Sequence, residues 1–279
     1  MSGLEGLRWV VALPSEASAL IEAYKLRLVR EHPFKVYKNA DETQALVISG
    51  LGRSASAAAT VFLAECAPSN QPLIFINVGI AGARDCELGS VWRAHKVICR
   101  STGKVWYPGA LGPRQGQSAN LVTVDQPELE YPDDSLFDME AAGFFEMASK
   151  LTSLELIQSL KVISDNSKEG IAGINKAKVT QWVCATLQPL ESLTKHLLNL
   201  RNTAHANLPP SEWEEKLCEK FHFSVTQRHQ LTRALSRYWA LSEAEQPVMQ
   251  CMDDAKDGKE YLKRLSAIVE TMPVMWGER

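Results

Sequence analysis

The sequence predicts an α/β protein, with a three-layer α/β/α sandwich around a central mixed sheet and a small all-α C-terminal segment. Continuous apolar runs at residues 7–13, 72–78 and 156–163 are typical of strands that are covered on both faces of a sheet. Segments with helical apolar spacing alternate with these runs, and no strand pattern follows Leu200. These observations predict the fold class.

The first elements are a strand, a helix and a hairpin. The strand at residues 7–13 leads through Pro14 into a helix whose first turn contains Glu16. Residues 34–37 and 45–49 have the composition of paired strands, and the polar residues between them predict a hairpin turn.

Glycines separate the elements that follow. Residues 50–54 form a glycine turn before a helix of small side chains at 55–65. The strand at 72–78 is expected to end in a second glycine turn at 79–82, and a further strand covers 90–99. The Gly-, Pro- and Gln-rich residues 101–118 predict a surface loop.

Two carboxylates, Glu140 and Asp165, lie at a predicted helix start and at a predicted strand end. After a short strand at 121–124, helices at 139–151 and 174–200 lie on either side of the strand that ends at Asp165. Open α/β sheets bind ligands where strand ends and helix starts meet, so Asp165 and Glu140 are expected to face one ligand. Such a pair is suited to hold a sugar and to protonate a base.

We expect two domains, residues 1–200 and residues 201–279, the second of unknown role. Residues 202–210, with two prolines, are typical of a linker. Three capped helices are predicted after it: 212–220 after Ser211, 225–240 after Ser224 and 258–271 after Asp257.

Composition excludes several classes of protein. The 279 residues carry a net charge of -3 with a pI near 6.1, so no overall basic field attracts nucleic acid or anionic lipid. Without a signal segment or an apolar run of about twenty residues, a cytoplasmic protein with no membrane partner is expected. The six cysteines form no C-x-x-C pair, and we expect no metal and no cofactor.

The predicted helix at 225–240 carries Arg228, His229, Arg233 and Arg237. Helices of this kind contact nucleic acid in some proteins, but neighbouring acids favour a solvated face. Nucleic acid is therefore not expected as a partner, and a role in interaction or oligomer capping stays open.

Five short motifs occur in order along the chain: VVALPSEA at 10–17, VISGLGRS at 47–54, INVGIAG at 76–82 with LGSV at 88–91, DMEA at 138–141 and VISD at 162–165. In this order they resemble the motifs of the nucleoside phosphorylase and nucleosidase superfamily, and the resemblance covers roughly residues 7–200. Relatives named by the resemblance include methylthioadenosine/adenosylhomocysteine nucleosidases and purine nucleoside phosphorylases.

The resemblance implies a catalytic pair. Asp165 would protonate the leaving base if burial keeps it protonated, and Glu16 would be the general base that activates water. The alternative for Asp165 is a cap of the following turn. For Glu16 it is an acidic residue that serves only the helix dipole.

The resemblance also implies four substrate-binding residues. Glu140 would accept hydrogen bonds from the ribose hydroxyls, Met139 would pack under the ring and Gly79 would let the backbone approach the substrate. Arg53 would bind phosphate in a phosphorolytic reaction. Each has an ordinary structural alternative: a helix-start carboxylate, a core methionine, a turn glycine and a surface arginine.

This chain departs from the family pattern at several positions. Ile80 stands where many relatives have serine, and Lys161 stands where nucleosidases have arginine. Residues 125–127 replace the aromatic that stacks on the purine, and Trp106 or Tyr107 could supply that stacking instead.

The function expected from these residues is cleavage of the N-glycosidic bond of a nucleoside, a purine nucleoside by preference, by hydrolysis. The alternatives are phosphorolysis with inorganic phosphate, and a catalytically degraded nucleoside-binding or scaffold module whose helical tail recruits a partner. Because relatives commonly form oligomers, a homo-oligomer is expected as well.

Overall fold

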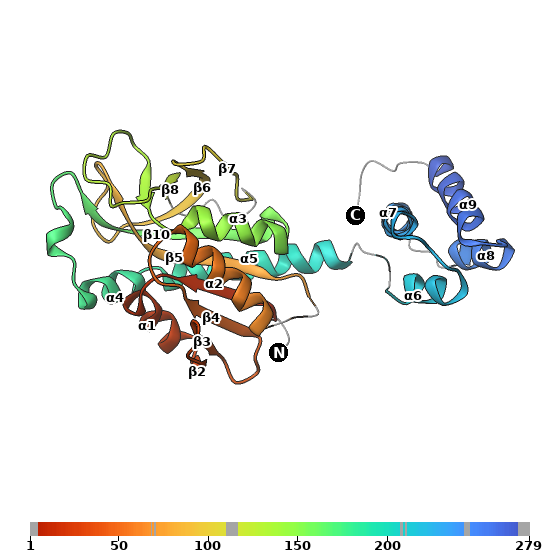
Figure 1. Cartoon of the computed structure of the whole chain (residues 1–279), viewed down its shortest axis with the longest axis horizontal. Coiled ribbons are helices and arrows are strands. Elements are labelled where there is room, and N and C mark those ends of the chain that lie inside the picture. Colours follow the sequence, from red (N-terminus) through yellow and green to blue (C-terminus); the bar gives the residue numbers. More distant parts are fainter. Residues whose placement is uncertain are drawn as a thin grey trace. The chain divides into compact units, whose positions relative to one another are not determined.

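The computed structural model describes residues 5–67, 69, 71–109, 117–206, 209, 211–242 and 246–272. The chain divides into two compact units, Met1–Asn199 and Leu200–Arg279. The two units are described separately below (Figure 1).

A mixed sheet forms the centre of the N-terminal unit. Its parallel part has the order β4-β1-β5-β10, with β4 (Gln44–Ile48), β1 (Leu7–Val11), β5 (Ile74–Ala83) and β10 (Ile157–Asn166). The strands β2 (Arg27–Arg30) and β3 (Lys35–Lys38) extend it antiparallel beyond β4. All five residues of β1 and all ten of β10 are buried, as their continuous apolar runs predict.

The other side of the sheet curls into a closed ring of strands. Four further strands take part: β6 (Val91–Cys99), β7 (Val105–Trp106), β8 (Gln117–Thr123) and β9 (Leu136–Asp138). Strand β10 pairs with both β5 and β6, and β9 pairs with both β5 and β8, so the path β5-β10-β6-β8-β9 returns to β5. This closure brings the ends of β5, β9 and β10 together.

Helices cover both faces of the sheet. On one face, α2 (Arg53–Cys66) packs on α3 (Ala141–Leu151), and on the other α1 (Pro14–Ala23) packs on α4 (Lys176–Cys184) (Figure 1). The phenyl rings of Phe75 and Phe144 meet at 6.3 Å between β5 and α3 in the buried core. The predicted three-layer α/β/α class is confirmed.

Several predicted boundaries are wrong. Residues 79–82 are not a turn, because their pairing with β10 carries β5 on to Ala83. The helix expected at 174–200 is two helices, α4 and α5 (Leu187–Ala206). Pro189 lies in the first turn of α5, and a proline ring clashes with the carbonyl four residues earlier, which prevents one continuous helix.

The C-terminal unit is helical in the part that the structure describes. Its helices are α6 (Ser211–Lys220), α7 (Val225–Leu241), α8 (Gln246–Asp254) and α9 (Gly258–Thr271), and α8 was not predicted. Ser224 and Asp257 cap α7 and α9 as expected, each accepting a hydrogen bond from a backbone N–H of the first turn. The predicted cap at Ser211 lies outside the described side chains.

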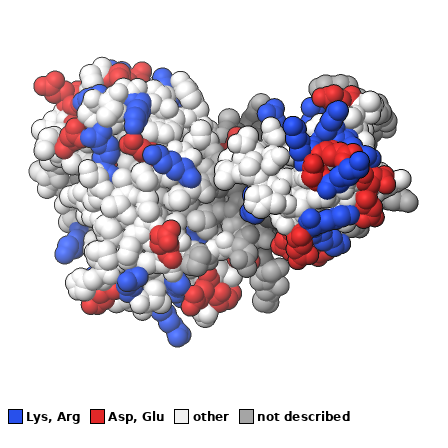
Figure 2. Space-filling model, turned by 45° about the vertical axis from the view of Figure 1, so that its right-hand side comes forward, with Lys and Arg blue, Asp and Glu red and all other residues white. Residues whose placement is uncertain are grey.

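Aromatic and leucine side chains form a separate core in this unit. Trp213, Leu217, Leu235 and Tyr261 are among the buried members of that core. Its surface is densely charged with both signs, whereas much of the N-terminal unit's face in the same view is uncharged (Figure 2).

The linker expected at 202–210 is helical up to Ala206, since α5 continues to that residue. Among the described helices, none combines the length and the apolar character needed to cross a bilayer.

Candidate functional site

A pocket of about 270 Å³ opens at the ends of β1, β5 and β10. Four of the six predicted site residues line it: Glu16, Met139, Glu140 and Asp165. Glu16 lies at a helix start, Met139 and Glu140 lie at the β9–α3 junction, and Asp165 lies at a strand end. The last three residues follow Glu16 by about 120 to 150 positions in the sequence. The fold thus brings the three predicted carboxylates to one cavity.

Glu16 is held at the pocket floor by backbone amides. Its Oε2 accepts hydrogen bonds from the N–H groups of Ala12 and Leu13, and its Oε1 accepts one from Ile80, 3.0 Å away. The side chain therefore joins the end of β1 to β5 and leaves Oε1 with one unused lone pair. Burial raises the pKa of Glu16, while the Lys161 charge and these N–H donors act in the opposite direction.

Glu140 lies beside the predicted glycine turn. Its Oε1 accepts a hydrogen bond from the Gly52 amide at 2.8 Å, and both Gly50 and Gly52 have positive φ angles that other residues rarely adopt. Burial, and next the neighbouring charge of Asp138, raise the pKa of Glu140 to about 7. A carboxyl group of this kind exchanges its proton near neutral pH.

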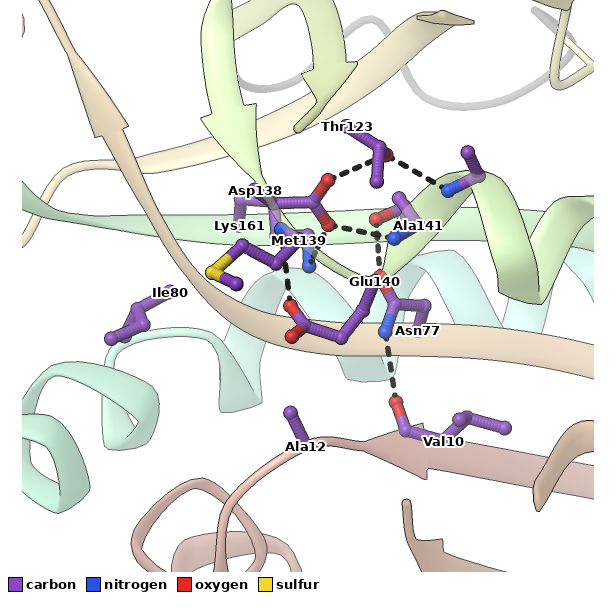
Figure 3. A network of polar contacts seen from close by, with 12 residues as sticks. Val10, Ala12, Asn77, Ile80, Thr123, Asp138, Met139, Glu140, Ala141 and Lys161 are labelled. Carbon is purple, nitrogen blue, oxygen red and sulfur yellow. Dashed lines mark hydrogen bonds and ion pairs between the residues drawn. The ribbon is translucent and has the colours of Figure 1, made fainter. Parts of the chain in front are cut away.

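A buried ion pair lies behind Glu140 (Figure 3). The Lys161 ammonium contacts Asp138 Oδ2 at 2.8 Å, and the two side chains are 2% and 0% exposed. Asp138 also accepts hydrogen bonds from the Thr123 hydroxyl and from the Ala141 amide at the start of α3. This network fixes the direction in which α3 leaves the sheet and hence the place of Glu140.

The charges of this network determine the state of Lys161. Desolvation acts to lower its pKa, but the carboxylates of Asp138, Glu140 and Glu16 outweigh that effect and the pKa is raised. Lys161 is therefore charged at neutral pH and partly balances three acids.

A polar bridge runs beneath the pocket between three strands. The Asn77 amide donates to the Val10 carbonyl at 3.1 Å (Figure 3), and Asn77 Oδ1 accepts a hydrogen bond from the Ser159 hydroxyl. These contacts satisfy a polar side chain that is 1% exposed and hold β1, β5 and β10 in register under the site.

Asp165 is positioned by a β-bulge. The pairing of β10 with β5 shifts between Ile163 and Asp165, which places Asp165 opposite Gly82. Its Oδ1 accepts a hydrogen bond from the Ser164 hydroxyl and its Oδ2 accepts one from the buried Tyr131 hydroxyl. A Cβ atom at Gly82 would lie 2.5 Å from Oδ2 and 2.8 Å from the Tyr131 ring, so only glycine leaves room for this contact.

The two remaining predicted residues differ in their position. Gly79 lies behind Glu16, where a Cβ atom would come within 2.8 Å of Glu16 Oε1. Arg53 does not line the pocket, and its guanidinium contacts Cys99 Sγ at 2.9 Å and the Ser101 hydroxyl at 2.8 Å. The structure therefore does not place Arg53 with the other predicted site residues.

The aromatic residues that were considered for stacking also lie elsewhere. Trp106 belongs to β7 and pairs with β6, and Tyr107 is 62% exposed with Lys96 over its ring. Neither is among the residues that line the pocket. Pro127 and Phe137 do line it, and theirs are the two side-chain rings of the described lining against which a base could pack.

Sequence reasoning missed Tyr131 and the role of Asp138. Tyr131 lies in a polar loop, where no periodicity or motif distinguishes it from the residues around it. In the sequence Asp138 is only the first residue of the DMEA segment at 138–141, and its pairing with Lys161 requires the contact between β9 and β10 that the closed ring of strands creates.

Comparisons with known proteins bear on the fold. No protein-family model matches the chain, and no curated protein matches it. A 5′-methylthioadenosine/S-adenosylhomocysteine nucleosidase from S. pneumoniae, solved with a transition-state inhibitor, superposes with a TM-score of 0.50 at 19% identity. The match covers 68% of this chain and 99% of that one.

Two further structures give the same result. The nucleosidase from Helicobacter pylori, with 5′-methylthioadenosine in its active site, has a TM-score of 0.54 at 11% identity over 67% of this chain and 97% of its own. The Arabidopsis thaliana 5′-methylthioadenosine nucleosidase has a TM-score of 0.52 at 16% identity, covering 73% and 95% of the respective chains. The comparisons therefore show that this chain has the fold of these nucleosidases over 67% to 73% of its length, which is the fold that the sequence motifs predict.

Proposed function

We propose that the N-terminal unit hydrolyses the N-glycosidic bond of a purine nucleoside. The observation that carries this proposal is that Glu16, Glu140 and Asp165 line one pocket in a fold whose solved neighbours are named nucleosidases. The purine is supported by those neighbours, whose names specify adenosine derivatives.

Each acid has a distinct task in this reaction. Glu140 accepts hydrogen bonds from the ribose hydroxyls, and its carboxylate stabilises the positive charge that develops on the sugar. Asp165 delivers a proton to the base as the electron pair of the C–N bond leaves with it. Water then bonds to the anomeric carbon while Glu16 Oε1 removes its proton, and the products are the free base and the free sugar.

Hydrolysis is favoured over phosphorolysis by the charge of the pocket. The described lining contains Glu16, Glu128, Asp138, Glu140 and Asp165 but no lysine, arginine or histidine. Phosphate is an anion that needs cationic or amide donors, but the Lys161 ammonium is paired with Asp138, and Arg53, the predicted phosphate ligand, is engaged outside the pocket. A neutral water molecule enters this acidic site at lower electrostatic cost.

A nucleoside-binding module without turnover is the second candidate. It is favoured by one observation, that both Asp165 oxygens already accept hydroxyl hydrogen bonds, which stabilise the ionised carboxylate rather than the acid. Nucleosides would then raise the melting temperature of the protein without release of base.

The test is release of free base from a panel of purine nucleosides, measured with and without inorganic phosphate. Equal rates in both conditions are expected. Asp165→Asn and Glu16→Gln should each reduce kcat about 100-fold or more, whereas Glu65→Gln, an exposed carboxylate on α2, should leave it unchanged. Turnover that requires phosphate would overturn hydrolysis, and full activity of Asp165→Asn would overturn the proton-donor role.

A further inference from the structure

A groove with a basic rim lies between α7 and α9 of the C-terminal unit. Arg233 and Arg237 line it from α7, and Lys259 and Lys263 line it from α9. Both pairs are four residues apart, so each helix presents two cations on one face, about 6 Å apart along its axis. The groove measures about 420 Å³, and its charged lining is completed by a single carboxylate, Glu270.

These four cations have no carboxylate partner among the described residues. Other charged residues of the same unit are paired: Arg264 with Glu260 at 2.8 Å, and Lys220 with Asp253 at 3.3 Å. Four exposed cations around one groove repel each other, and an acidic occupant would relieve that repulsion.

The floor of the groove is apolar. Ala234, Leu262 and Val269 line it between the cations, and Leu262 and Val269 are buried members of the helical core. The described lining has no aromatic side chain on which the bases of a nucleic acid strand could stack, so such a polyanion would use mainly the cations. A helix that presents acidic side chains would use both parts of the groove. Its carboxylates would pair with the cations, and the CH₂ groups of the same side chains would contact the apolar floor.

The same unit carries a matching surface on α6. Glu212, Glu215 and Glu219 are exposed and follow the i, i+3, i+7 spacing of one helix face. That face points away from Leu217, which is fully buried in the helical core. Among the described residues, none of these three glutamates has an ion-pair partner, and the spacing of Glu215 and Glu219, about 6 Å, matches that of the cation pairs.

We propose that the C-terminal unit binds a second copy of this chain, with the acidic face of α6 from one copy in the α7–α9 groove of the next. The contact joins two different surfaces, so each copy keeps one groove and one acidic face free for further copies. Assembly therefore continues beyond a dimer as concentration rises, unless the rotation between copies closes a ring. The proposal does not depend on the activity of the N-terminal unit.

The test measures the mass of the full chain by light scattering at protein concentrations from about 1 to 200 μM, in low and moderate salt. We expect an average mass that rises with concentration and falls in salt, since exposed charge pairs are screened. Reversing the groove with Arg233→Glu and Arg237→Glu, or the α6 face with Glu215→Lys and Glu219→Lys, should weaken association at least about tenfold.

Mixing the two reversed proteins provides the decisive step. In the mixture, the acidic groove of one variant can bind the basic α6 of the other. The basic groove of the second variant can bind the acidic α6 of the first, so association should return. The matched control, Arg228→Glu with Lys256→Glu, alters two exposed cations of the same unit that do not line the groove, and it should associate like the parent protein.

Three results would overturn the proposal. The first is a mass that stays monomeric throughout the concentration range. The second is association that both reversals leave unchanged, which would place the contact on another surface. The third is loss of association that mixing does not restore. A monomer whose groove binds a labelled single-stranded oligonucleotide, lost in the groove variant, would identify a nucleic acid site instead.

Discussion

Replacement of Lys161 by methionine is expected to destabilise the N-terminal unit strongly, in a manner that depends on pH. Methionine has nearly the same length and no charge, so the variant removes the ammonium group without opening a large cavity. The side chains of Lys161 and Asp138 are 2% and 0% exposed, and the carboxylates of Glu16 and Glu140 also act on this ammonium.

Loss of one partner of a buried ion pair costs about 3 to 5 kcal/mol, because the other charge stays buried without compensation. Here three carboxylates lose their cation. The pKa values of Glu16 and Glu140, which are already raised in the folded protein, should rise further, so the folded state would bind more protons than the unfolded state, and its stability would fall as the pH rises. We expect the loss at about pH 8 to exceed the loss at about pH 5.5 by at least about 1 kcal/mol.

Hydrogen exchange of the amides in β5 and β10, measured by mass spectrometry, reports on the N-terminal unit alone. An unfolding curve of the whole chain would instead combine the unfolding of both units. Lys104→Met is the matched control, because its partner Glu146 and its own side chain are 33% and 55% exposed. Such an exposed pair contributes at most about 1 kcal/mol. A Lys161→Met loss below about 1 kcal/mol, or one equal at both pH values, would refute the reasoning.

Three further variants test the pocket. In the parent protein, the raised pKa of Glu140 means that stability falls as the pH rises from 4.5, the ordinary pKa of this carboxyl group, towards about 7. Glu140→Gln should make this fall smaller in thermal melts and should still lower kcat/KM. Tyr131→Phe removes the hydroxyl that donates to Asp165 Oδ2 and helps to hold this side chain in place, so kcat should fall about tenfold, and an unchanged kcat would contradict a positioning role for that contact. Gly79→Ala should displace Glu16 and lower kcat about tenfold with little change in KM, whereas an equal change in both would point to substrate binding.

Much of the fold follows from local patterns. Continuous apolar runs are confirmed as the buried strands β1, β5 and β10, because a strand covered on both faces buries the side chains of both faces and is therefore rich in apolar residues. The caps at Ser224 and Asp257 were predicted from residue type alone, since a cap depends only on the few residues around it.

The chain by itself therefore determined the fold class and the elements on which Glu16, Glu140 and Asp165 lie, because these depend on short-range periodicity and on residue type. Only the tertiary structure decided which distant groups meet. The Lys161–Asp138 pair, the Tyr131–Asp165 contact and the removal of Arg53 from the pocket depend on strand register and on the path of loops. Those features arise from packing over the whole sheet, and no local stretch of sequence encodes them.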